Sequence, residues 1–174
     1  MNKIQVAYTR SKNIKDILCR AKLYPVENRS SQRNKQGWYI CGKKCIVCSH
    51  SNNMKSIKCT STGEMHDIKQ KLSCRDSSVI YIIQCTKCPR NNQYVGQTRQ
   101  PFYNRMLNHR SDVFKSKDTA IGEHFSTRGH NTSHMKFYAI EKVIGDHFTL
   151  GQRERFYIQK FNTVYDGLNR NFTN

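Results

Sequence analysis

A short apolar run followed by a Cys-x-x-Cys loop and a second short segment constrains the fold of this chain more than any other feature. Ser78 to Gln84 contains the run VIYII, which is short enough for a buried strand and has polar residues on both sides. Gln93 to Gln97 is the expected hairpin partner. The loop between them, CTKCPRNN, replaces an ordinary turn with two cysteines, and a bound metal would make it rigid. The sequence therefore predicts an antiparallel hairpin around which the main domain is organised.

A helix is expected directly after this hairpin. Pro101 suits the first turn of a helix, where its missing N–H costs nothing. Spacings of three and four place four side chains along one side of it: Phe102, Met106, His109 and Val113. Arg105 lies one turn before His109 on an adjoining line. This helix is therefore expected to carry an arginine and a histidine close together.

The remaining elements complete a small α+β domain. Asp118 is expected to cap a second helix that stops at Gly129. A third strand is expected over 135–144, and Thr149 with Gln152 forms a capping box for the last helix. The fold class predicted is α/β (α+β), with a small, mainly antiparallel three-stranded sheet flanked by helices and with zinc-binding insertions.

The last helix carries a carboxylate where apolar residues are expected. Glu154 recurs at spacings of three and four with an apolar set: Leu150, Tyr157, Ile158 and Phe161. Burying a carboxylate is costly unless it has a partner or a metal. Glu154 is therefore the strongest single candidate for a functional residue.

The charge of the chain favours nucleic acid as a partner. Lys and Arg total 30 against 12 Asp and Glu, a net charge of +18, spread over the whole length. Such a surface attracts phosphate through counterion release, although ribosomal, membrane-surface and heparin-binding proteins share the signature. No stretch approaches the roughly 18 apolar residues of a membrane helix, and the first eleven residues lack the apolar core of a secretory signal. An intracellular protein without membrane partners is expected.

Eight cysteines in an intracellular chain favour metal over disulfides, because thiols stay reduced there. A disulfide scaffold with four bridges is the alternative. Two Cys-x-x-Cys pairs, Cys45 with Cys48 and Cys85 with Cys88, have the spacing of tetrahedral zinc sites. The upstream site would combine Cys41, Cys45 and Cys48 with a fourth ligand. Cys74 is favoured for that place, with Cys59 second and His50 and His66 as further candidates.

Three segments are expected along the chain. Residues 1–36 would form a basic N-terminal helix, from about Asn13 to Leu23, and a polar linker. Residues 37–76 would form the cysteine-rich zinc knuckle and its connection, and residues 77–174 the main domain.

The order of polar residues in the main domain resembles that of the GIY-YIG nuclease family. Val79-Ile80-Tyr81 stands at the GIY position and Tyr94-Val95-Gly96 at the YIG position. Four further residues match the remaining functional places: Arg105, His109, Glu154 and Asn169. The chain departs from the family in having Val79 where the first Gly is usual, which affects strand packing more than chemistry. The resemblance implies a phosphodiester hydrolase that acts as a DNA endonuclease.

More narrowly, the chain is similar to the C-terminal endonuclease of Penelope-like retroelements. The similarity lies in the cysteines between the two tyrosine motifs, the His-Phe…Gly-His segment, the closing Gly-Leu-Asn and the cysteine-rich region upstream. It implies a nickase that cuts target DNA to expose a 3′ hydroxyl for reverse transcription. The implied partners are DNA, the element RNA and the reverse transcriptase part of the same polyprotein, and the implied location is the nucleus.

Each residue of the site then has an expected role. Glu154 would hold one Mg²⁺ (or Mn²⁺), and Arg105 would donate to the nonbridging phosphate oxygens. Tyr81 or Tyr94 would be the general base, and the sequence does not choose between them. His109 would position phosphate or relay a proton, and Asn169 would orient the site.

A structural zinc is expected beside this site. Cys85 and Cys88 need two more ligands, and His124 with His130 would complete a Cys2His2 site. His134 is the substitute for His130, and His147 is disfavoured because it follows the third strand. Two functions compete with the retroelement nickase. One is a zinc-stabilised nucleic-acid-binding module without catalysis, and the other is a stand-alone repair or junction nuclease.

Overall fold

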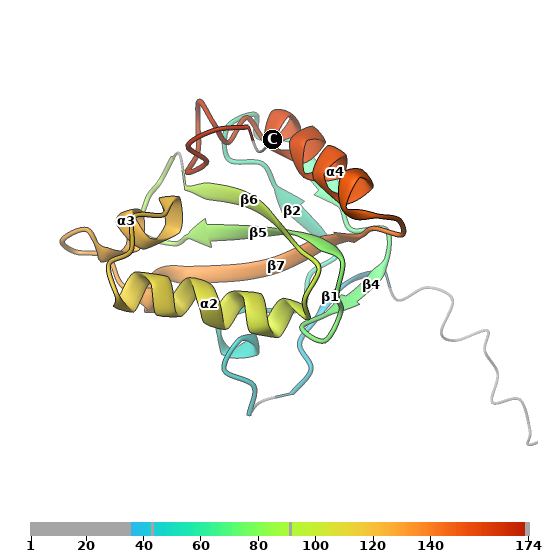
Figure 1. Cartoon of the computed structure of the whole chain (residues 1–174), viewed down its shortest axis with the longest axis horizontal. Coiled ribbons are helices and arrows are strands. Elements are labelled where there is room, and N and C mark those ends of the chain that lie inside the picture. The colour runs from blue at the N-terminus through green and yellow to red at the C-terminus, as the bar shows by residue number, and fades with distance from the viewer. Residues whose placement is uncertain (1–35, 43, 91, 173–174) are drawn as a thin grey trace, which may run out of the picture. The chain divides into compact units, whose positions relative to one another are not determined.

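A three-stranded antiparallel sheet forms the centre of the molecule (Figure 1). The structure, a computed structural model, describes residues 36–42, 44–90 and 92–172. The sheet has the order β6 (Gln93–Thr98), β5 (Val79–Cys85), β7 (Met135–Lys142), with both neighbours antiparallel to β5. The expected hairpin and third strand are therefore present. The helix expected between Asn13 and Leu23 lies outside the described residues.

The central strand β5 is buried on both faces. All residues from Val79 to Ile83 have no exposed surface, which explains the continuous apolar run in place of alternation. Tyr81 is paired with Gly96 on one side and with Ala139 on the other, and the register shifts between Ile80 and Tyr81 on the β7 side. The strand therefore holds a tyrosine in the middle of the core.

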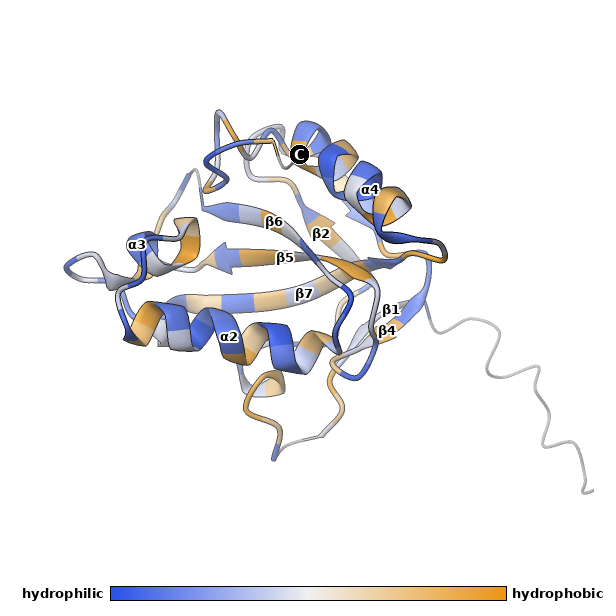
Figure 2. Ribbon diagram, in the orientation of Figure 1, coloured by the Kyte–Doolittle hydropathy of each residue, from blue (hydrophilic) through white to orange (hydrophobic). Residues whose placement is uncertain are grey.

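Helices lie on either side of this sheet. Figure 1 shows the strands passing between α2 (Phe102–Phe114) and α4 (His147–Lys160), with the short α3 (Ala120–Ser126) next to α2. Both longer helices alternate apolar and polar residues along their length, as Figure 2 shows. Within the described ranges, no helix combines the length and apolar character needed to cross a bilayer.

The upstream segment packs onto the same core. β1 (Gly37–Tyr39) pairs in parallel with β4 (Lys71–Ser73), and β2 (Ser56–Lys58) pairs antiparallel with β3 (Met65–Asp67). Trp38 is fully buried with its ring 4.9 Å from that of Phe102 on α2.

Two residues at the end of the short helix η2 (Cys48–His50) connect the same segment to β7. His50 Nδ1 lies 3.1 Å from the carbonyl oxygen of Met135, and the Ser51 hydroxyl donates to the carbonyl oxygen of Phe137. The cysteine-rich segment thus shares its core with the main domain, although the expected division into segments remains a prediction.

Two helix starts differ from those expected. The N-cap of α3 is Thr119, whose hydroxyl accepts from Gly122 N, and not Asp118. Helix α4 begins at His147 and not at the Thr149 capping box, because the Asp146 carboxylate accepts from both the backbone N and the hydroxyl of Thr149. The earlier start adds a turn to α4 and places His147 on the helix.

Candidate active site

The hydroxyl of Tyr81 is the centre of a buried polar cluster. It lies 2.7 Å from His109 Nε2 and accepts from Arg105 Nε at 3.0 Å. Tyr81 comes from β5, whereas Arg105 and His109 come from consecutive turns of α2. The expected neighbourhood of these three residues is therefore realised, and α2 supplies both partners of the tyrosine.

The direction of these hydrogen bonds follows from the protonation states. Burial, with a smaller contribution from Arg105, lowers the pKa of His109 to about 3, so its imidazole is neutral at physiological pH. Burial, followed by the nearby Tyr94, raises the pKa of Tyr81 far above its usual range. Since the Arg105 guanidinium can only donate, His109 Nε2 is the partner that can accept the proton of the Tyr81 hydroxyl. In that arrangement His109 carries its proton on Nδ1, a buried atom without a hydrogen-bond partner among the described residues.

Glycine is required at position 96 by the close approach of the two tyrosines. A Cβ atom there would lie 2.6 Å from the Tyr81 hydroxyl and 2.8 Å from a ring carbon of Tyr94. Both distances are far below van der Waals contact. Gly96, the last residue of the Tyr-Val-Gly sequence of β6, therefore leaves the space that the Tyr81 hydroxyl occupies.

Asn169 lies outside the buried polar cluster around Tyr81 and is hydrogen-bonded to β6. Its Oδ1 accepts from Val95 N at 2.9 Å, and its Nδ2 donates to the Val95 carbonyl oxygen at 2.8 Å. Leu168 N donates to the Gln93 carbonyl oxygen at 2.9 Å. The segment that contains Leu168 and Asn169 thus pairs with the free edge of β6. Val95, to which Asn169 is bonded, stands between Tyr94 and Gly96.

A groove of about 340 Å³ passes in front of this cluster. Tyr94, Arg105 and Glu154 all line it, together with Gln97, Thr98, Arg99 and His147. Glu154 is only 3% exposed, yet its side chain reaches this groove from the second turn of α4. Burial, followed by Glu154, raises the pKa of Tyr94. One carboxylate, one guanidinium and one phenol therefore face the same space.

His147 is a groove residue that the sequence reasoning missed. The sequence disfavours His147 as a zinc ligand because it follows the third strand, and it predicts a final helix that begins only after Thr149. Since α4 begins at His147, residues 147 and 154 lie two turns apart on the same side of the helix, and both line the groove. The signal available in the sequence was Asp146. An N-cap side chain accepts from the backbone N–H three residues later, and Thr149 stands at that distance from Asp146.

The four residues expected to bind the first zinc converge on one point. Ligand atoms of Cys85, Cys88, His124 and His130 lie within 4.8 Å of one another. Cys88 Sγ lies 3.8 Å from His124 Nε2 and 3.2 Å from His130 Nε2. A tetrahedral zinc separates its sulfur and nitrogen ligands by about 3.5 Å, so the set fits the metal. His134 is outside this set, and its Nδ1 accepts from Asn131 N.

A second group of ligand atoms lies near the start of α2. It consists of Cys41, Cys45, Cys48 and Cys74, also within 4.8 Å of one another. The Sγ atoms of Cys45 and Cys74 are 3.8 Å apart, and those of Cys48 and Cys41 are 3.5 Å apart. A zinc tetrathiolate has sulfur atoms separated by about 3.8 Å, which this set matches. Cys59 lies elsewhere, with Sγ beside the carbonyl oxygen of Phe161.

Comparison with known proteins identifies the family of this chain. A family model described as the GIY-YIG catalytic domain matches residues 77–169, more than half of the chain, and the chain therefore belongs to the GIY-YIG family. Among solved structures, a mutant of the catalytic domain of intron endonuclease I-TevI is similar with 24% sequence identity and a TM-score of 0.48. That match covers 57% of this chain and 98% of that chain. No curated protein matches the chain.

Family membership establishes the class of enzyme. GIY-YIG domains are metal-dependent nucleases, so the chain is a DNA endonuclease and the binding module without catalysis is disfavoured. Val79, which replaces the usual first Gly of the family, is fully buried and paired with Thr98 and Lys142. The substitution is therefore accommodated at a position of β5 that is paired on both sides.

Proposed function

We propose that this chain is the endonuclease of a Penelope-like retroelement, which nicks target DNA and leaves a 3′ hydroxyl that primes reverse transcription. The observation that carries the nicking activity is the groove in which Tyr94, Arg105 and Glu154 meet. The two groups of four metal ligands support the narrower assignment, because they involve the cysteines on which the similarity to these elements rests.

The carboxylate of Glu154 would hold the divalent cation. Oxygen ligands suit Mg²⁺ or Mn²⁺, and a nearly buried carboxylate that reaches a groove fits such an ion. When bound, the cation polarises the phosphate and neutralises charge on the departing oxygen. The described residues place one carboxylate in this groove, which is fewer than a two-metal nuclease uses.

Arg105 and Tyr94 would bind the scissile phosphate. The Arg105 side chain lines the groove while its Nε donates to Tyr81, so its orientation is fixed before DNA arrives. A guanidinium held in this way stabilises the charge that develops on the nonbridging oxygens. Tyr94 also faces the groove and can donate its hydroxyl proton to the same phosphate.

Tyr81 would act as the general base, with His109 as the acceptor of its proton. Neutral His109 Nε2 lies 2.7 Å from the Tyr81 hydroxyl, and Arg105 donates to the same oxygen, which favours phenolate character. Because burial raises the pKa of Tyr81, the phenolate does not accumulate at neutral pH. As the bond from water to phosphorus forms, the Tyr81 oxygen would take a proton from that water while the Tyr81 proton passes to His109 Nε2.

The remaining partners follow from the assignment to a retroelement. The enzyme would act in the nucleus on target DNA, together with the element RNA and the reverse transcriptase part of the same polyprotein. Zinc held by each cysteine-containing cluster would be structural, since four protein ligands leave no open position for a reactant.

A plasmid nicking assay tests the proposal. With Mg²⁺, the wild-type chain is expected to convert supercoiled DNA to open circles, and Glu154→Gln is expected to abolish nicking while folding normally. Glu64→Gln, which removes an exposed carboxylate, is the matched control and should nick at the wild-type rate. Equal rates for wild type and Glu154→Gln would refute the role of the groove.

The ends of the nick test the priming role. A polymerase should extend the nicked strand directly, because the expected product carries a 3′ hydroxyl. Product ends that need phosphatase treatment before extension, or linear plasmid as the first product, would contradict a priming nickase. Preferential cutting of branched DNA over a linear duplex would favour a stand-alone junction nuclease.

A further inference from the structure

A second hollow of the molecule, of about 570 Å³, lies beside the Cys41, Cys45 and Cys74 thiols. Lys44 and Arg75 contribute cationic side chains to its lining, and Pro101, Tyr103 and Asn104 contribute the first turn of α2. None of these five residues is buried. The hollow therefore combines two cationic side chains with aromatic and apolar surface that solvent can reach, beside four thiolates that with zinc would carry a formal charge of about −2.

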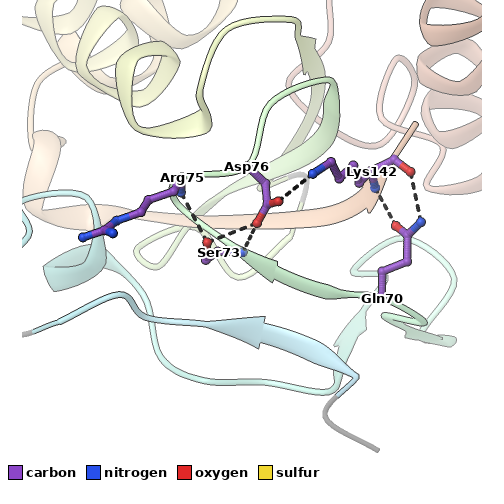
Figure 3. Close-up of polar contacts among 5 residues, drawn as sticks. All are labelled: Gln70, Ser73, Arg75, Asp76 and Lys142. Carbon is purple, nitrogen blue, oxygen red and sulfur yellow. Dashed lines mark hydrogen bonds and ion pairs between the residues drawn. The ribbon is translucent and has the colours of Figure 1, made fainter. Parts of the chain in front are cut away.

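The positive charge of Arg75 is available for a ligand. Figure 3 shows its guanidinium extending away from the adjacent Asp76. The Asp76 carboxylate is occupied elsewhere, because it accepts from Ser73 N, from the Ser73 hydroxyl and from Lys142 Nζ (Figure 3). Among the described residues, neither Arg75 nor Lys44 takes part in an ion pair.

Tyr103 supplies a ring whose backbone is fixed. Its N–H donates to the Cys74 carbonyl oxygen at 2.8 Å, and Phe102 N donates to the Asp76 carbonyl oxygen at 2.8 Å. These bonds tie the first turn of α2 to the segment that carries Arg75. The half-buried ring of Tyr103 lines the hollow, and aromatic faces of this kind stack on nucleobases of any identity.

This hollow lies next to the active-site groove along the chain. Residues 97–99 and Arg105 line the groove, whereas Pro101, Tyr103 and Asn104 between them line the hollow. The same short segment thus faces the groove at both ends and the hollow in its middle. A DNA strand whose phosphate lies at Arg105 has only to cross the first turn of α2 to reach Tyr103.

We propose that this hollow binds one nucleotide of the DNA strand that is cut in the groove, with its phosphate between Lys44 and Arg75 and its base on the ring of Tyr103. The proposal rests on the DNA-nicking function proposed above and extends the substrate footprint to the cysteine-rich segment. Nucleic acid is favoured over a peptide because the two free cations and the net charge of +18 match a polyanion. The base must leave its stack to reach the ring, so a nucleotide without a paired partner fits best.

A DNA-binding experiment tests the proposed nucleotide site. The affinity for a fluorescent duplex with a single-stranded overhang is measured over a range of salt concentrations, without added divalent cations. Arg75→Ala and Lys44→Ala are each expected to reduce the slope of log affinity against log salt by about 1. Tyr103→Ala is expected to weaken binding about tenfold without changing that slope, and Tyr103→Phe to bind like wild type. Lys58→Ala, an exposed lysine that lines neither hollow, is the control.

The outcomes separate this inference from the proposed function. Wild-type slopes and affinities for all three alanine variants would overturn it, even if Glu154→Gln abolishes nicking. If Arg75→Ala loses zinc while the salt slope stays unchanged, the charge serves the cysteine cluster and the inference also fails. If the wild-type chain does not nick, the proposed function fails, whereas reduced slopes would still establish the nucleotide site. Lys58→Ala should nick at the wild-type rate.

Discussion

The side chain of Asn169 satisfies both backbone hydrogen-bonding groups of Val95, one on either side of the same residue. The amide therefore takes the place of an additional strand at the edge of β6. Val95 stands between Tyr94 and Gly96, so this pair of bonds sets the position of the groove tyrosine. Asn169 is thus attached through the backbone to the strand that carries the groove residue Tyr94.

Replacing Asn169 is expected to destabilise the protein. Asn169→Ala leaves the buried N–H and carbonyl of Val95 unpaired, and we expect a loss of about 2 to 4 kcal/mol in unfolding free energy. Asn169→Asp retains the acceptor but sets a buried carboxylate against the Val95 carbonyl oxygen, so it should lose at least as much. Chemical denaturation measures both. Asn171→Ala, at an exposed position, should be neutral, and equal stability of both alanine variants would contradict the account.

Gly96→Ala is expected to impair nicking strongly. The added Cβ would lie 2.6 Å from the Tyr81 hydroxyl, so the tyrosine must move away from Arg105 and His109. The nicking rate should fall at least about tenfold, the equivalent of roughly 1.4 kcal/mol. Gly151→Ala is the matched control, because Gly151 lies on the helix that carries Glu154 and its Cβ would meet no atom of another segment within 4 Å. That control should be neutral or slightly more stable than wild type.

The two tyrosines are expected to differ when each loses its hydroxyl. Tyr81→Phe removes the proposed base and leaves Arg105 Nε without its acceptor, so single-turnover nicking should fall by about 10² to 10⁴-fold. Tyr94→Phe removes a groove donor and should raise the DNA concentration needed for half-maximal rate, with a smaller effect on the maximal rate. The reverse pattern would assign the base to Tyr94.

The free energy of unfolding is expected to depend on pH through His109. Its pKa is about 3 in the folded state against roughly 6.5 when unfolded, so the unfolded chain binds the additional proton between these values. The contribution of this group is complete above about pH 6.5 and falls by about 1.4 kcal/mol per pH unit as the pH drops toward 3. Denaturation of wild type and His109→Gln between pH 7 and 4.5 measures it. Parallel curves for the two proteins would contradict a buried neutral histidine.

Metal analysis is expected to find two zinc ions per chain. Cys88→Ser should retain one zinc and lose stability, because the loop after β5 and the helix α3 would no longer be joined. Cys59→Ser should retain both ions, since Cys59 belongs to neither cluster. Less than about one zinc per wild-type chain would refute the metal assignment.

The sequence predicted the elements whose signals are local. The apolar run at β5, Pro101 before α2 and the stripe containing Glu154 each lie within one element, and each element is present. The predicted start of α4 was wrong because two capping patterns overlap, one at Asp146 and one at Thr149. Asp146 is the N-cap, and its carboxylate accepts from both the backbone N and the hydroxyl of Thr149. His147 was missed as a groove residue for the same reason.

Contacts between distant segments were beyond the sequence. The parallel pairing of β1 with β4 joins Gly37 to Lys71 across intervening structure, and no residue pattern specifies such a partner. The buried packing of Trp38 on Phe102 depends on that pairing. The amino-acid order suggested that Asn169 orients the site, but its attachment to Val95 became visible only in three dimensions.

The packing of Trp38 against α2, together with the bonds of His50 and Ser51 to β7, has an evolutionary consequence. Genetic exchange that transferred only residues 77–169 would remove Trp38 and Leu72 from the core and leave their neighbours in contact with water. Lineages that inherit this nuclease are therefore expected to inherit the upstream cysteines with it, as a single heritable unit larger than the family motif.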